Sequence, residues 1–171
     1  LPGAARSPFG SGVLIIRGAN PEDSGVYVDG IRIPYIYHIG GYVSVINPEL
    51  IEAVDYLPGN YGVQYGRSTG GVIDVKTKSE APEQDRIVWS TDLLDSGGVY
   101  EGRLGANGHH HVGVAARRSY IDKVLPLVQQ FRQSGFTANP RWQDYQLRYS
   151  YNGWDNTRVS AFVFGFDDRI I

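Results

Sequence analysis

The 171-residue sequence contains no cysteine and no methionine, and it has no long apolar run. Without cysteine, neither a disulfide framework nor a thiolate metal site can form. The missing methionine indicates a processed or partial product, and residues 1–10 lack the charged and apolar regions of a signal peptide, so we expect any such peptide to have been removed. The longest apolar runs are only a few residues long, such as residues 13–16, whereas a membrane-spanning helix needs about 20 apolar residues. The sequence therefore predicts no transmembrane helix, and short alternating strands of a membrane β-barrel remain compatible with it.

Charge of either sign is also scarce. The formal net charge is −2 and 20% of the residues are charged, so nothing indicates a nucleic-acid-binding surface. What the chain does contain is glycine and tyrosine, with 22 and 12 copies. This composition is typical of a β-rich chain with many turns, and it is too apolar and aromatic for a disordered one.

Residues 1–80 contain short and varied segments. Residues 12–18 read as a buried strand, and residues 24–35 read as two short strands around the turn dipeptide Asp29-Gly30. Asn47 is the expected N-cap of a single helical turn that begins at Pro48. We expect that turn to lead into a strand at 53–57, and a closing strand to follow at 72–77. The mixture predicts a small α+β domain.

Residues after the polar linker 79–85 follow a different pattern. Five longer strands are expected, and lengths of about 9 to 11 residues suit tilted strands that cross a bilayer. The clearest alternation places four apolar or aromatic side chains on one face and four polar side chains on the other. The apolar set is Tyr145, Leu147, Tyr149 and Tyr151, and the polar set is Gln146, Arg148, Ser150 and Asn152. The expected strands are 86–94, 98–106, 110–119, 143–152 and 157–167.

The connections between these strands differ in length. Asn107-Gly108 and residues 152–156 predict tight turns, and residues 95–98 predict a third short connection. The connection 119–142 is long and contains a helical pattern that we expect Pro126 to interrupt. Outer-membrane barrels have short periplasmic turns and longer extracellular loops, so this order places the long connection outside if residue 86 starts on the periplasmic side.

Four segments resemble, in order, the plug domain of TonB-dependent outer-membrane receptors. The most specific is "LPGNYGVQYGRSTGGVIDVKTK" at 57–78, which is similar to the end of that plug. "IIRG" at 15–18, "VYVDGIRIP" at 26–34 and "NPELIEAVDYLPG" at 47–59 resemble its earlier parts. "RRSYID" at 117–122 also resembles a strand-to-loop junction in some of these receptors.

The resemblance implies an α+β plug domain at 1–80, followed at 81–171 by antiparallel strands of a transmembrane β-barrel of about 22 strands, the size class with a plugged lumen. Such a barrel needs over about 200 residues in strands, and only about 90 follow position 80, so we expect a fragment. The implied function is TonB-coupled import of a scarce solute, such as a ferric siderophore, across the Gram-negative outer membrane. Its partners would be TonB, outer-membrane lipid and that solute. No TonB box is visible, and a receptor-like barrel that serves adhesion, export or structural interaction is the alternative function.

The resemblance also implies residue roles. Arg17 and Arg67 resemble arginines that pair with acidic residues of the barrel wall. A plug loop that would face the extracellular substrate holds Tyr35, Tyr37, His38 and Tyr42. Packing against the barrel wall is the alternative role for these four.

The segment before the last plug strand is rich in glycine and is followed by lysines. We expect Gly62, Gly66, Gly70 and Gly71 to permit tight turns and close backbone approach. Lys76 and Lys78 would discourage edge pairing of that strand.

Residue patterns for catalysis or metal binding are weak. His109, His110 and His111 are adjacent, so on a strand they alternate between faces and cannot converge on one ion. The acidic pair Asp167-Asp168 lacks the spacing of a calcium loop. Neither a phosphate loop nor a nucleophile elbow is present. We therefore expect no enzyme, no metal and no cofactor. A soluble periplasmic binding protein is the remaining rival.

Overall fold

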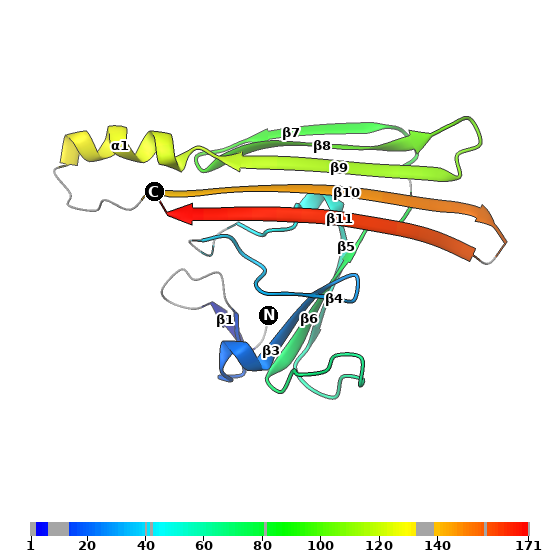
Figure 1. Ribbon diagram of the computed structural model, residues 1–171, viewed down its shortest axis with the longest axis horizontal. Helices are drawn as coiled ribbons and strands as arrows, with labels where there is room; N and C mark the ends of the chain where they lie inside the picture. The colour runs from blue at the N-terminus through cyan, green and yellow to red at the C-terminus, as the bar shows by residue number, and fades with distance from the viewer. Residues whose placement is uncertain are drawn as a thin grey trace. The chain divides into compact units, whose positions relative to one another are not determined.

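The structure, a computed structural model, describes residues 3–6, 14–39, 41, 43–80, 82–132, 139–155 and 157–170. The chain divides into two compact units, Leu1–Lys78 and Ser79–Ile171, which are described separately (Figure 1). The domain boundary expected after residue 80 stays a prediction.

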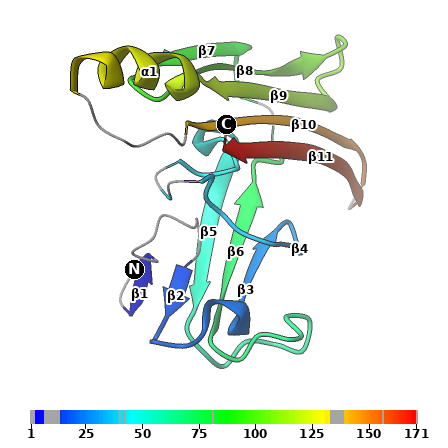
Figure 2. The same cartoon turned by 60° about the vertical axis from the view of Figure 1, so that its left-hand side comes forward.

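The first unit contains a two-stranded and a four-stranded sheet. In the small sheet, β1 (Ala4–Arg6) pairs antiparallel with β2 (Leu14–Ile16), and Ile16 is fully buried. The larger sheet has the order β4-β3-β6-β5, and Figure 2 shows β3, β6 and β5 side by side. Its strands are β3 (Ser24–Val28), β4 (Ile31–Ile33), β5 (Ile51–Leu57) and β6 (Gly71–Thr77).

The turn between β3 and β4 forms where the sequence predicted it. Asp29 and Gly30 have φ of 48° and 79°, which are the paired positive values of a two-residue hairpin turn. The Asp29 carboxylate also accepts hydrogen bonds from the backbone N–H of Thr77, at 2.9 Å, and from the Thr77 hydroxyl. The turn is therefore tied to the C-terminal end of β6.

The predicted helical turn is also confirmed. After η1 (Pro21–Asp23), the second 3-10 turn is η2 (Pro48–Leu50), and the Asn47 side chain accepts a hydrogen bond from the Glu49 N–H at 3.0 Å. Leu50 is buried and anchors the turn. The strand that follows begins at Ile51, two residues before the predicted start.

Strand β6 lies in the centre of its sheet. It pairs parallel with β3 and antiparallel with β5, and Val72, Ile73 and Val75 are almost completely buried. The expectation that Lys76 protects an edge strand is therefore wrong, because β6 has a neighbour on both sides. The exposed ammonium group of Lys76 instead pairs with Asp55 of β5.

The second unit is a meander of five antiparallel strands in the order β11-β10-β9-β8-β7 (Figure 1). The five predicted strands are present, with changed boundaries. They are β7 (Arg86–Thr91), β8 (Asp95–Leu104), β9 (His110–Ser119), β10 (Pro140–Trp154) and β11 (Thr157–Ile170).

The turn between β7 and β8 differs from the prediction. Residues 95–98 were expected to form it, but they belong to β8, and the turn lies at 92–94. The Asp92 carboxylate accepts hydrogen bonds from the N–H groups of Leu94 and Asp95, at 2.7 and 2.9 Å. Gly97 and Gly98 suggested a turn at 95–98. The correct signal was Asp92, because an aspartate side chain often accepts hydrogen bonds from backbone N–H groups two or three residues later in a turn.

The long connection contains α1 (Ile121–Arg132). The helix continues through Pro126, so the predicted interruption does not occur. It begins after Tyr120, whose carbonyl accepts hydrogen bonds from the N–H groups of Lys123 and Val124. Within the ranges that the structure describes, no helix has both the length and the apolar character needed to cross a membrane.

Candidate functional site

The glycine-rich segment before β6 contains two kinds of glycine. A Cβ at Gly71 would lie 2.6 Å from the Ile16 side chain, and one at Gly70 would lie 2.6 Å from the Ala19 Cβ. These two positions have the predicted close approach. A Cβ at Gly66 would meet nothing within 4 Å, so close approach is not the reason for that glycine. At the turn formed there, the positive φ of 62° falls on Arg67.

Three tyrosines gather around this segment. The rings of Tyr27 and Tyr61 each meet Tyr65 edge to face, with centroids 5.0 and 6.4 Å away. The hydroxyls of Tyr27 and Tyr61 donate to the carbonyls of Gly66 and Ser68. A segment without regular structure is thereby fixed to β3 and to itself by aromatic packing and hydrogen bonds.

The third tyrosine hydroxyl contacts a buried charge. Tyr65 donates to Oδ2 of Asp74 at 2.7 Å, and Asp74 lies in the middle of β6. This hydrogen bond, followed by burial and by the charge of the carboxylate, raises the pKa of the Tyr65 phenol. The glycine-rich segment and the central strand are therefore coupled by one polar contact.

The predicted substrate residues lie on a tight loop. Its ends are closed by a bridge between Tyr37 and Ser44 and by hydrogen bonds from the His38 N–H to Val43 and from the Val45 N–H to Ile36, both 2.8 Å. Tyr35 and Tyr37 are half-buried, whereas His38 is fully buried. The fourth predicted residue, Tyr42, lies outside the described residues. The substrate role of all four stays a prediction.

A hollow of about 340 Å³ lies beside this loop, within the first unit. Tyr37 and Ser44 form its loop side, and Val54 and Ile73 belong to the sheet side. The side chain of Tyr37 thus faces apolar strands of its own unit. Among the three of these residues that the structure describes, Tyr35 and Tyr37 are partly exposed, and Tyr35 does not line the hollow.

The two predicted contact arginines are both exposed and both have positive φ, 52° at Arg17 and 62° at Arg67. The Arg17 guanidinium donates to the carbonyl of Pro58 at 3.0 Å, and its backbone N–H donates to Gly3. Arg17 therefore joins the small sheet to the loop after β5. The predicted role of Arg17 and Arg67 at the barrel wall stays a prediction.

One face of the five-stranded sheet, here called the polar face, carries a charged network. Asp144 of β10 accepts from Arg117 of β9, with Nη2 to Oδ2 at 3.0 Å, and from Nε2 of Gln146 at 2.8 Å. The Arg117 guanidinium also lies 5.6 Å from the centre of the Trp142 ring. Arg86 of β7 pairs with Glu101 of β8 on this face. The acidic and amide partners in these contacts, Asp144, Gln146 and Glu101, are all buried, as are Arg148 and Ser150.

The opposite face of the sheet, here called the apolar face, is exposed. Tyr145 is 58% exposed and Val163 is 57% exposed. The alternation predicted for 145–151 is confirmed, but its sense is the reverse of a soluble sheet because the polar side chains are the buried ones. The large exposed side chains of this face are Ile87, Trp89, Leu104, Val114, Tyr145, Leu147, Val159 and Val163.

The adjacent histidines alternate as expected. His111 is buried, and His110 lies with Tyr149 and Tyr151, its Nδ1 2.8 Å from the Tyr149 hydroxyl. Among the residues that the structure describes, no group of three or more histidines, aspartates or glutamates could hold a metal ion.

The network of Arg117, Asp144 and Gln146 was not predicted from the sequence. Alternation had placed Gln146 on a polar face, which was the available signal. Gln146 donates to Asp144 on its own strand, and the contact of Asp144 with Arg117 on β9 depends on the register Asp144↔Arg117. Side-chain alternation alone does not fix the register of two strands that are separated by the connection 120–139.

Comparisons with known proteins agree with this architecture. The sequence model of the TonB-dependent Receptor Plug Domain matches residues 1–72. The TonB-dependent transporter Oar of Myxococcus xanthus is 33% identical over 84 residues, which cover 48% of this chain and 7% of Oar. The vitamin B12 transporter BtuB of Vibrio cholerae is 24% identical over 167 residues, which cover 91% of this chain and 27% of BtuB.

Solved structures show the same fold. A mutant of the ferric enterobactin receptor PfeA from Pseudomonas aeruginosa aligns with a TM-score of 0.65 and 16% identity, over 99% of this chain and 30% of PfeA. The siderophore receptor PirA from Pseudomonas aeruginosa aligns with a TM-score of 0.62 and 18% identity, over 98% of this chain and 30% of PirA. The chain thus spans less than a third of each of these relatives.

Proposed function

Because this chain belongs to the TonB-dependent receptors, as a plug domain followed by antiparallel strands, we propose that it is part of an outer-membrane transporter. The receptor would bind a scarce extracellular solute and import it with energy delivered through TonB. The matched proteins are transporters and receptors, and the chain is not an enzyme. The barrel of about 22 strands is part of the proposal.

The observation that carries the proposal is the reversed burial of the five-stranded sheet. A lipid-facing strand needs apolar side chains outside, and a strand that lines a wet or plugged lumen needs polar side chains inside. Strand β10 has this pattern, with Leu147 exposed and Arg148 buried next to it. A large exposed apolar face would cause a soluble protein to aggregate. The pattern therefore supports a membrane receptor over a soluble periplasmic binding protein.

The solute is proposed from chemistry and from the relatives together. PfeA, PirA and BtuB are described as receptors or transporters of ferric enterobactin, siderophores and vitamin B12. We infer that a ferric siderophore is the first candidate and that cobalamin is the second. Tyr35 offers a half-exposed aromatic ring for stacking against either one.

The test is uptake by cells that express the receptor carrying this chain. Labelled ferric siderophores and labelled cobalamin are supplied separately, with TonB present or absent. We expect accumulation of one class of solute only when TonB is present. Solute binding without any TonB-dependent accumulation would instead support the receptor-like barrel without transport.

The proposed contact of Tyr35 with the solute is tested by variants of Tyr35 in the same assay. Tyr35→Ala should weaken solute binding about fivefold, as expected for roughly 1 kcal/mol from one aromatic contact. Tyr35→Phe keeps the ring and should bind as the unmodified receptor does. Val63→Ala, at a fully exposed position of the glycine-rich segment, is the control for general damage to the plug. Equal binding by Tyr35→Ala and the control would remove Tyr35 from the site.

A further inference from the structure

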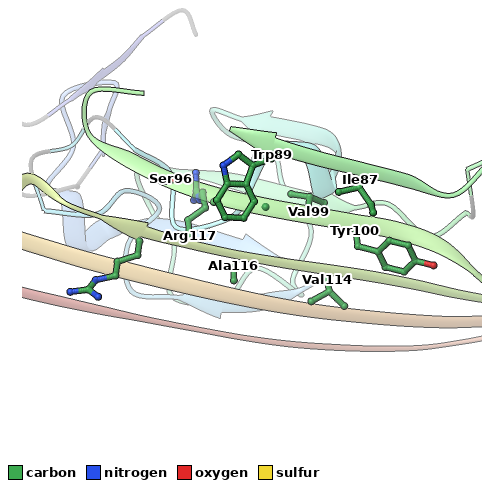
Figure 3. Close-up of a pocket in the computed structure, with 11 residues that line it drawn as sticks. Ile87, Trp89, Ser96, Val99, Tyr100, Val114, Ala116 and Arg117 are labelled. Atoms are coloured by element: carbon green, nitrogen blue, oxygen red, sulfur yellow. The ribbon is translucent and has the colours of Figure 1, made fainter. Parts of the chain in front are cut away.

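The apolar face has a groove over β7, β8 and β9. The strand register places Trp89, Gly98 and Ala116 in one row across these strands. The side chains in this row are one large indole beside a hydrogen atom and a methyl group. The groove has a volume of about 570 Å³, and Ile87, Tyr100 and Val114 form the next row of its lining. Figure 3 shows the Trp89 ring over β8, with Tyr100 directed away from it.

Two tyrosine rings beside the groove extend over residues other than Ala116. The Tyr100 hydroxyl donates to Asp85 at 3.0 Å, and a Cβ at Gly102 would lie 2.3 Å from that hydroxyl, so Tyr100 extends over Gly102. A Cβ at Gly165 would lie 2.4 Å from the Tyr145 hydroxyl, so Tyr145 extends over Gly165. The Trp89 ring lies against Gly98, where an added Cβ would be 2.9 Å from Cε3 of the indole, so the open part of the floor is at Ala116, which is exposed and lines the groove. Trp89, 73% exposed, forms one wall.

A second hollow of about 320 Å³ adjoins the groove and shares Trp89, Ser96 and Arg118 with it. Two cations, Arg118 and Lys123, line this second hollow, and both are exposed. Asp122 is the one acidic residue among its lining residues. The shared lining therefore joins an apolar groove to an end with a net positive charge.

We propose that this pair of hollows binds one phosphorylated lipid of the outer leaflet, with an acyl chain in the groove and an anionic headgroup at Arg118 and Lys123. The inference rests on the proposed function, because it requires the apolar face to meet lipid. Charge complementarity selects an anionic headgroup over a zwitterionic one. Volume also fits, since an acyl chain is long and narrow and the groove is lined by small residues between larger ones.

The position along the strands agrees with this leaflet. Arg118 precedes the end of β9, and Lys123 lies in the first turn of α1, within the long connection. Long connections of outer-membrane barrels are extracellular, so the cationic end lies on the outer side. The phosphates of a glycolipid in that leaflet lie at the same level as interfacial Arg and Trp side chains.

The test uses the complete receptor that carries this chain, purified in detergent and mixed with a diphosphorylated acyl glycolipid (lipid A) or with phosphatidylethanolamine. Native mass spectrometry measures bound lipid. Arg118→Ala and Lys123→Ala should each weaken lipid A binding about fivefold, the change expected for one basic side chain near an anionic headgroup. Ala116→Trp fills the floor and should weaken binding about tenfold, the equivalent of roughly two displaced methylene groups.

Two matched controls lie outside the hollows. Arg169→Ala removes an exposed cation at the same end of the sheet, and Val163→Trp adds an indole to the same face. Both should bind lipid A as the unmodified receptor does. Equal losses in site variants and controls would overturn the inference, as would equal binding of the two lipids.

Solute uptake by the same variants separates this inference from the proposed function. A receptor that imports its solute but shows no preference for lipid A keeps the proposed function and rejects the lipid site. A receptor that never assembles in the outer membrane rejects both.

Discussion

Gly66 and Gly71 are five positions apart, but an added methyl group would meet very different surroundings at the two positions. Gly71 is buried, and an added Cβ would meet the Ile16 side chain at 2.6 Å and the Leu57 carbonyl at 3.3 Å. Gly66 is exposed, and its Cβ position is open. The difference follows from neighbours in space, since both residues have glycine-rich surroundings in the sequence.

We therefore predict that Gly71→Ala destabilises the plug by about 1–3 kcal/mol, the usual cost of overpacking. Gly66→Ala should change its stability by less than about 0.5 kcal/mol, as surface substitutions do. Hydrogen exchange of β2 and β6 in the receptor measures both effects. Equal protection in the two variants would show that the small sheet moves aside to accept the methyl group.

At the scale of the element, β6 carries two polar contacts on one face, at Asp74 and Lys76. Tyr65 reaches Asp74, and Asp55 reaches Lys76. The hydrogen bond to Asp74 raises the pKa of Tyr65, and the hydrogen bond to Asp55 raises the pKa of Lys76. The fold thus favours the neutral phenol and the charged ammonium. Both contributions to stability are fully present below pH about 10 and are lost as pH rises through the raised values.

We predict that Tyr65 ionises above pH about 10, the usual midpoint of a tyrosine. The difference between absorbance titrations at about 295 nm, the phenolate band, of the receptor and its Tyr65→Phe variant isolates this one phenol. Asp74→Asn removes the adjacent negative charge and should lower the midpoint, whereas Asp23→Asn, at an exposed carboxylate, should leave it unchanged. A midpoint that Asp74→Asn does not move would mean that the contact is absent in solution.

The elements themselves were largely predictable from local chemistry. Asp29-Gly30 placed a turn and Asn47-Pro48 placed a helical start, because both signals act within four residues. The central position of β6 was not predictable, since its parallel partner β3 lies about 45 residues earlier. The same reason explains why Lys76 was interpreted as an edge residue. Pairing partners depend on the whole topology, whereas turns depend on their own side chains.

At the scale of the whole molecule, we predict that the apolar face contacts lipid. Val163→Arg places a charge on that face near the middle of β11 and should cost about 2–4 kcal/mol of stability in a bilayer. Ser160→Arg places the same charge at an exposed position of the opposite face and should cost much less. Guanidinium titrations of the receptor refolded in liposomes measure both values. Equal costs would contradict a membrane location for this sheet.

The candidate site was predictable only in part. The resemblance assigned a substrate role to the loop of Tyr35, Tyr37 and His38, which stays a prediction, and alternation identified the polar set of β10. The partners across strands, such as Arg117 with Asp144, depend on register, and the groove beside Trp89 depends on which way Tyr100 and Tyr145 lean. These properties belong to the assembled sheet.

The pairing of β1 with β2 has a mechanical consequence. Ala4 lies opposite Ile16, and the bond from the Arg17 N–H to the Gly3 carbonyl closes the end of the pair nearest the N-terminus. Tension applied ahead of Gly3 would load these bonds one after another, beginning with that closing bond, and an antiparallel pair opened in this direction yields at low force. Among the strands that the structure describes, β1 pairs with β2 and not with the four-stranded sheet, so we expect this peeling to leave β3, β6 and β5 joined.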